Sequence, residues 1–210
     1  MKSALVFGSG GGSNFKSIYK HIETGELALN ISCVISNNST SGILHFASEK
    51  GLNTFHLSQK KLPDAKEYEH AYLNLLDTYS PDLVILAGYM KHIPASFIQR
   101  MPFKILNIHP SLLPAFGGHG MYGLNVHKAV FQRGTKISGA TIHFVTEDYD
   151  EGPILLQEQV LLNGDESPEE IAEKVLQVEH TLYPKAVKIC IDGDYIIKEN
   201  RVVLLERENK

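Results

Sequence analysis

Short apolar runs that alternate with longer helical patterns constrain this chain more than any other feature of its sequence. Ala4–Phe7, Ile31–Ile35, Leu83–Ala87 and Ile105–Ile108 each have five residues or fewer and show no strict alternation of apolar and polar residues. Strands buried on both faces of a parallel sheet have this pattern. Between them, Lys66–Tyr79 places tyrosines and leucines on one side of a helix. The order of strands and helices predicts an α/β fold with a doubly wound, mostly parallel sheet.

The second half of the chain begins with a long loop. Prolines and glycines crowd residues 110–123, which predicts irregular structure there. Ser167, Pro168 and Glu170 have the order of an N-cap, a first turn and a capping box, so a long helix should begin at this point. The other expected elements are strands at Ile137–Val145 and Ile154–Val160, and a terminal hairpin of Tyr195–Lys198 with Arg201–Leu205.

Length and composition favour a single globular domain over residues 1–210. Hydrophobic residues make up 43% and charged residues 21%, close to the globular average, which excludes a disordered or collagen-like chain. A net charge of −4 without a basic run excludes a dedicated nucleic-acid-binding protein. No apolar run approaches the ~20 residues that span a bilayer, and the start leads into a strand pattern rather than a signal peptide. We expect a cytoplasmic monomer or homodimer that acts on small molecules, with no nucleic-acid or membrane partner.

Cysteines and histidines give no sign of a disulfide or a metal site. Cys33 and Cys190 both lie in apolar surroundings and are expected to be buried, reduced thiols. The ten histidines include no HExxH or similar ligand spacing. We therefore expect no metal.

Residues 8–14, here called the glycine loop, read Gly-Ser-Gly-Gly-Gly-Ser-Asn between a strand and a helix expected to begin near Asn14 or Phe15. Backbone amides at such a helix start favour an anion. Ser13-Asn14 is not the Lys-Ser/Thr pair of a nucleotide-binding P-loop, and Ser36-Asn37-Asn38 lacks the acidic residue of a dinucleotide site. The glycine loop predicts a site for one phosphate, with a ligand-free tight turn as the alternative.

A polar pair, Asn107 and His109, lies at the carboxyl end of a buried strand pattern, the edge where ligands bind in open α/β sheets. In an extended chain both side chains point to the same face. An amide donor beside an imidazole suits a developing oxyanion, although a hydrogen-bonded core histidine is an equal alternative.

An acidic loop follows the strand Gly139–Thr146. Its carboxylates are Glu147, Asp148, Asp150 and Glu151, and spacing does not tell which of them approaches His109. A solvated acidic turn is the alternative.

These residues together resemble the glycinamide ribonucleotide formyltransferase family. The resemblance depends on the run Asn107–Pro114, on Gly139–Thr146 leading into Asp150-Glu151-Gly152-Pro153, and on Gly12-Ser13-Asn14, and it extends from Leu5 to about Pro184. It implies a Rossmann-like formyltransferase fold, with residues 1–100 as a phosphate-binding half and 101–210 as a catalytic and folate-binding half. It also implies transfer of a formyl group from 10-formyltetrahydrofolate, a co-substrate, to the amine of a phosphorylated glycinamide in purine (IMP) biosynthesis.

The resemblance also implies roles for individual residues. The catalytic residues are Asn107, His109 and Asp150. The substrate-binding residues are Gly12, Ser13, Asn14 and Glu179, and the folate-binding residues are Met90, Lys91, His92, Ile93, Asn107, Thr146, Glu147, Asp148, Tyr149 and Asp150. Glu179 has independent support, because it lies at the edge of an inward stripe of Ile171, Val175, Val178 and Leu182, where a carboxylate needs a partner.

In the implied mechanism the amine attacks the formyl carbon directly, while protonated His109 and Asn107 stabilise the oxyanion. A carboxylate at hydrogen-bond distance is expected to raise the pKa of His109 and keep it charged.

Two features depart from the family pattern. Asp64-Ala65-Lys66 stands where many members have an arginine, and the loop 115–123 is longer than usual. Formyltetrahydrofolate deformylase is the alternative enzyme, since it uses the same Asn, His and Asp but usually carries an extra amino-terminal domain. Methionyl-tRNA formyltransferase would need a carboxy-terminal RNA-binding domain, and a non-catalytic folate- or nucleotide-binding module is the alternative outside enzymes.

Overall fold

The computed structural model describes residues 1–205 and divides into two compact units, Met1–Asn107 and Ile108–Lys210. Each unit has its own buried apolar residues and is described by itself. The predicted phosphate loop lies in the first unit, and the predicted His109 and Asp150 lie in the second.

The first unit is built on parallel strands. Neighbouring strands pair in parallel in the order β3-β2-β1-β4-β5, as the pattern of short apolar runs predicts. The central strands are buried on both faces, which explains their lack of polar alternation. Their bounds are β1 Lys2–Phe7, β2 Leu29–Ser36, β3 Thr54–His56, β4 Leu83–Leu86 and β5 Ile105–His109, the last of which crosses into the second unit.

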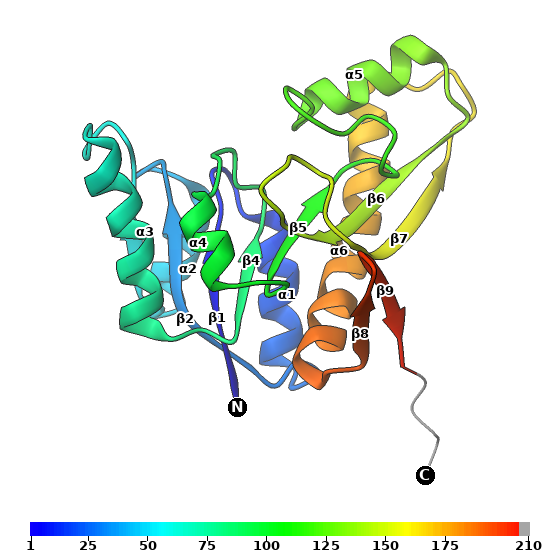
Figure 1. The fold of residues 1–210 in the computed structure, drawn as a ribbon. Coiled ribbons are helices and arrows are strands. Elements are labelled where there is room, and N and C mark those ends of the chain that lie inside the picture. The colour runs from blue at the N-terminus through cyan, green and yellow to red at the C-terminus, as the bar shows by residue number, and fades with distance from the viewer. Residues whose placement is uncertain (206–210) are drawn as a thin grey trace. The chain divides into compact units, whose positions relative to one another are not determined.

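Helices connect these strands (Figure 1). Helix α1 packs on α2, and α3 packs on α4. Helix α3 shows why the chain folds this way locally: Asp64 caps it by accepting bonds from two first-turn amides, and Tyr72, Leu75 and Leu76 form its buried face. The bounds are α1 Ser13–Glu23, α2 Gly42–Glu49, α3 Ala65–Tyr79 and α4 Ala95–Arg100. The βαβ order of this unit confirms the doubly wound prediction.

The second unit places a long helix against an antiparallel strand pair. Helix α6 packs on β6, β7 and α5, and Figure 1 shows it crossing the two strands at an angle. The capping box at Ser167 and Glu170 forms as predicted. The bounds are α5 Leu124–Arg133, β6 Ile137–Phe144, β7 Ile154–Leu161, α6 Pro168–Asp192, and a hairpin of β8 Tyr195–Lys198 and β9 Arg201–Leu204.

Seven strands make one mostly parallel sheet, in the order β3-β2-β1-β4-β5-β6-β7, which confirms the predicted α/β class. The sequence patterns did not identify four elements, namely α2, β3, α4 and α5. Strand β3 has only three residues, two of them exposed, so it carries no apolar run to detect.

The burial of two cysteines and of the α6 stripe differs in part from the sequence predictions. Cys33 is buried, but Cys190 is only partly buried, and both thiols are free. On α6, Val178 is only half-buried, whereas Glu179 is itself buried at 8% exposure. Among the described residues, no helix is both long and apolar enough to cross a bilayer.

Candidate active site

His109 ends β5 and meets Asp150 from the acidic loop. The His109 ring is 3% exposed, and its Nδ1 lies 3.5 Å from Oδ2 of Asp150. Its other nitrogen, Nε2, donates a hydrogen bond to the carbonyl oxygen of Phe116 at 2.8 Å. Of the four carboxylates that the sequence left open, Asp150 is the one that the structure places beside His109.

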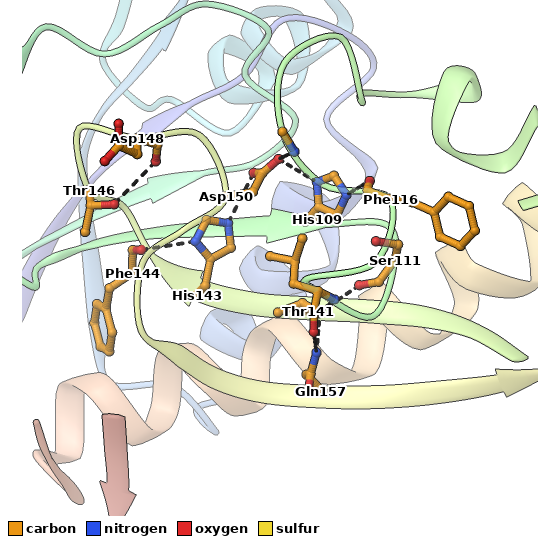
Figure 2. Close-up of polar contacts among 12 residues, drawn as sticks. His109, Ser111, Phe116, Thr141, His143, Phe144, Thr146, Asp148, Asp150 and Gln157 are labelled. Atoms are coloured by element: carbon orange, nitrogen blue, oxygen red, sulfur yellow. Dashed lines mark hydrogen bonds and ion pairs between the residues drawn. The ribbon is translucent and has the colours of Figure 1, made fainter. Parts of the chain in front are cut away.

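Asp150 has two further neighbours that the sequence analysis did not identify. Its Oδ1 lies 3.6 Å from Nε2 of His143, which comes from β6 and is 2% exposed. Its Oδ2 also accepts a hydrogen bond from the backbone N–H of Gly118 at 2.9 Å. One carboxylate therefore faces two imidazoles and a backbone amide, as Figure 2 shows.

The segment that leaves β5 is fixed to β6 by a buried hydroxyl. Thr141 Oγ1 donates to the Ser111 carbonyl at 2.7 Å and accepts from the Leu113 N–H at 3.0 Å. Gln157 of β7 donates to both Thr141 Oγ1 and the Leu113 carbonyl, each at 2.9 Å (Figure 2). Because these bonds satisfy buried polar groups, they hold the chain next to His109 in one conformation.

The acidic loop returns to β6 through a close approach at Gly152. A Cβ atom on this residue would lie 1.7 Å from the Phe144 carbonyl oxygen, so only glycine fits. Asp150 itself has a φ of 59°, a left-handed conformation that costs a non-glycine residue energy. The loop is therefore held in a strained conformation that turns the Asp150 side chain toward the two rings.

Burial overrides the carboxylate in setting the pKa of His109. The sequence predicted a raised pKa, but burial lowers it below the usual 6.5, and the Asp150 charge and the Phe116 carbonyl offset this only in part. The pKa of His143 is lowered for the same reason, with Asp150 again opposing the shift. The expectation of a raised pKa was wrong because the effect of burial on His109 is larger than that of the Asp150 charge.

Asn107 and Glu179 lie on regular elements. Asn107 precedes His109 by two residues in β5 and is half-buried, so the alternation of the strand directs both side chains to one face. Glu179 lies on the buried face of α6.

The glycine loop has the backbone that an anion site needs. Gly12 caps α1 with a φ of 73°, and the helix begins at Ser13, one residue before the predicted start. A Cβ atom on Gly12 would approach the side chain of Ile43 to 2.8 Å, so a larger residue does not fit. Ser13 is exposed, and Asn14 is buried in the first turn.

The two predicted folate-binding segments differ in exposure. In Met90–Ile93, the first three residues are exposed and Ile93 is buried at 3%. In the loop from Thr146 to Tyr149, Thr146 Oγ1 donates to the Asp148 carbonyl at 3.3 Å, and Tyr149 is 49% exposed. Each segment therefore exposes one large apolar side chain, Met90 in the first and Tyr149 in the second, and side chains of these types suit contact with an aromatic ring.

Sequence reasoning missed His143, Phe116 and Gly118. His143 gave one signal, a titratable residue inside a strand of otherwise uncharged residues that leads to the acidic loop. Phe116 and Gly118 act through backbone atoms, which leave no trace in the side-chain pattern. Within residues 1–205, no group of three or more His, Cys, Asp or Glu side chains is arranged to hold a metal ion.

Comparison with known proteins identifies the family. The formyl transferase family matches residues 1–187. This chain belongs to that family. It is 39% identical over 208 residues to a protein of Arabidopsis thaliana named phosphoribosylglycinamide formyltransferase, chloroplastic, and the match covers 99% of this chain and 71% of that protein.

Two solved structures share the fold of this chain. Glycinamide ribonucleotide transformylase 1 from Symbiobacterium toebii is 35% identical with a TM-score of 0.90, covering 98% of this chain and 95% of that one. A formyltetrahydrofolate deformylase from Pseudomonas syringae pv. tomato is 25% identical with a TM-score of 0.88, covering 98% of this chain and 66% of that one. The deformylase has a third of its length outside the match, whereas the transformylase matches nearly end to end.

Proposed function

We propose that this formyl transferase moves the formyl group of 10-formyltetrahydrofolate onto the amine of N1-(5-phospho-D-ribosyl)glycinamide (glycinamide ribonucleotide), a step of IMP biosynthesis. The observation that carries the proposal is that Asp150 lies beside His109 in a chain of this family. His109 in turn follows Asn107 by two residues on the same strand. The name of the Arabidopsis relative and the near end-to-end likeness to the transformylase support the same substrate.

In the proposed reaction, Asn107 and His109 bind the formyl oxygen. The substrate amine attacks the formyl carbon, a C–N bond forms, and the carbonyl oxygen takes up negative charge. His109 Nε2–H already donates to a carbonyl oxygen, that of Phe116, which supports its role as an oxyanion donor. The formyl oxygen has to take the place of the Phe116 carbonyl to receive this bond.

Collapse of the tetrahedral intermediate breaks the bond from the formyl carbon to N10 of the folate. A proton leaves the attacking nitrogen and reaches N10, through water, so that tetrahydrofolate departs neutral at that atom. Asp150 stabilises the imidazolium form of His109 against the effect of burial. No covalent formyl-enzyme and no metal take part.

The remaining residues bind the two substrates. We assign the phosphate to Gly12, Ser13 and Asn14 at the start of α1, and the glycinamide end to the buried Glu179. We assign the folate to Met90, Lys91, His92 and Ile93, to Asn107, and to the loop from Thr146 through Glu147, Asp148 and Tyr149 to Asp150. Residues 1–210 would act as one formyltransferase domain in the cytoplasm, as a monomer or homodimer.

Deformylase activity is the alternative, and the structural likeness to the Pseudomonas syringae deformylase supports it. Purified protein mixed with 10-formyltetrahydrofolate, with and without glycinamide ribonucleotide, separates the possibilities. We expect tetrahydrofolate release only when the amine substrate is present. Release without it means a deformylase, and no release in either mixture means a binding module and overturns the proposal.

A further inference from the structure

Three loops of the first unit meet at the hydroxyl of Ser9. They follow β1, β2 and β4, so all three leave the carboxyl ends of neighbouring parallel strands. Ser9 belongs to the glycine loop, Asn37 follows β2, and Gly88–Met90 follows β4.

Ser9 makes two hydrogen bonds to the chain beyond β4. Its backbone N–H donates to the Gly88 carbonyl at 3.1 Å, and its Oγ accepts from the Met90 N–H at 2.8 Å. The hydroxyl proton goes elsewhere, because Ser9 Oγ donates to Oδ1 of Asn37 at 2.5 Å. Asn37 therefore turns the hydroxyl so that its lone pair faces Met90.

These bonds join the two segments that the proposed function assigns to different substrates. From Ser9 the glycine loop continues to Gly12–Asn14, the proposed phosphate site. Met90 itself begins the proposed folate segment Met90–Ile93. The Ser9 hydroxyl donates its proton to Asn37 and accepts the Met90 N–H, so both of these bonds join one loop to another and fix the distance between the segments.

We propose that Ser9 is a positioning residue that holds the phosphate loop and the folate segment in register, so that binding of either substrate favours binding of the other. This inference depends on the proposed function. A substrate that orders the glycine loop also orders Met90 through Ser9, and the second substrate then binds a segment that is already in place. The same register brings the amine close to the formyl carbon, where a misplacement of about 1 Å costs up to ~100-fold in rate.

Ser9→Ala tests the inference, because it keeps the bond from the backbone N–H to Gly88 and removes only the hydroxyl. In wild type, we expect tetrahydrofolate to bind several-fold more tightly when glycinamide ribonucleotide is present, a pair that cannot react. In Ser9→Ala this factor should fall close to 1, and kcat should fall about 10-fold. The dissociation constant of each ligand alone should stay within about 3-fold of wild type. Isothermal titration measures the two dissociation constants and the factor by which one ligand tightens the other, and steady-state rates measure kcat.

Two further variants complete the test. Ser3→Ala removes a serine hydroxyl at the opposite end of β1 from the glycine loop. This hydroxyl donates to Asp82 Oδ2 at 3.3 Å, so the variant should keep the wild-type binding factor and kcat. Asn37→Ala leaves the Met90 bond but frees the hydroxyl to rotate, and we expect an intermediate loss; it also decides the matter if Ser9→Ala does not fold.

Three results overturn the inference, and a fourth overturns the proposed function. An unchanged binding factor and kcat in Ser9→Ala, or in Asn37→Ala where only that variant folds, overturns the inference. Equal weakening in Ser9→Ala of the binding of each ligand alone also overturns it, because that result indicates a merely structural hydroxyl. A wild-type protein that binds tetrahydrofolate equally well with and without glycinamide ribonucleotide overturns it too. Absence of amine-dependent formyl transfer by the wild type is a different failure, because it overturns the proposed function first.

Discussion

Asp150 shares its charge between two buried rings, and this arrangement limits what either ring can do alone. His109 and His143 each give one nitrogen to a backbone carbonyl, that of Phe116 and that of Phe144, and turn the other toward Asp150. A neutral imidazole has only one N–H, so it cannot satisfy both neighbours. The imidazolium can, although burial opposes it. The site thus holds His109 ready to be charged when an oxyanion develops beside it.

Asp150→Asn keeps the shape of this side chain and removes its charge. The Asp150 charge raises the pKa of His109 against the effect of burial, so the variant should have a still lower pKa. If the imidazolium is the donor, activity falls as pH rises through that pKa, and the fall should begin at lower pH in the variant. The rate near neutrality should drop on the order of 10²–10³-fold. Profiles of kcat against pH measure both effects.

Glu151→Gln is the matched control, since it removes a charge from the next residue, which is exposed. Its profile should match that of wild type. If the high-pH limb of Asp150→Asn stays in place and the neutral rate is retained, Asp150 is not the partner of His109.

Asn14 should serve binding rather than chemistry. It is buried in the first turn of α1, two residues after Gly12, where the backbone amides favour an anion. We expect Asn14→Leu to raise KM for glycinamide ribonucleotide more than 10-fold and to leave KM for 10-formyltetrahydrofolate within about 3-fold. Equal increases for the two substrates count against a phosphate site at this helix start.

At the scale of the elements, the glycine loop depends on one residue that no other type can replace. Gly12 has a left-handed backbone, and its Cα faces Ile43 of α2 so closely that a Cβ atom would lie 2.8 Å from the Ile43 side chain. Gly12→Ala should therefore displace the start of α1 and raise KM for glycinamide ribonucleotide at least 10-fold.

Gly25→Ala provides the control for that variant. Gly25 has a φ of 80°, but no heavy atom lies within 4 Å of the position that a Cβ atom would take, so alanine brings the backbone strain of ~1–2 kcal/mol without crowding. Both variants should lose some thermal stability, and only Gly12→Ala should weaken substrate binding. Wild-type KM values in Gly12→Ala would exclude the loop from the phosphate site.

The elements that sequence predicted share a strong local signal. β1, β2, β4 and β5 each contain a short apolar run, α3 has a regular stripe and a cap, and α6 opens with a capping box. β3 and α4 lacked such a signal, being three and six residues long. At the site, spacing placed Asn107 and His109 together, but the choice of Asp150 among four carboxylates depended on the turn at Gly152, where the loop packs closely on the Phe144 carbonyl of β6. The sign of the His109 pKa shift failed because sequence does not give burial.

At the scale of the whole molecule, buried histidines make stability depend on pH. His109, His127 and His143 are buried and His180 is partly buried, and the pKa of each is lowered mainly by burial, to about 4 for His127. The folded chain keeps these rings neutral at pH values where imidazoles of the unfolded chain, with a pKa of ~6.5, are already protonated. The unfolded state then binds more protons, so stability should fall as pH drops below ~6.5.

His127 is the residue on which this expectation is most easily tested. It is 5% exposed on α5, and its Nδ1 is buried with no hydrogen-bond partner among the described residues, so His127→Leu breaks no bond at that atom. A pKa of about 4 against ~6.5 corresponds to roughly 2 kcal/mol of unfolding free energy lost between pH 7.5 and 5. His127→Leu should remove about that much of the acid sensitivity while staying within ~1 kcal/mol of wild type at pH 7.5. His45→Leu, at an exposed position of α2, should leave the acid sensitivity unchanged. Urea unfolding at pH 7.5 and 5 measures all three proteins, and an equal loss in wild type and His127→Leu would show that this ring is not the source.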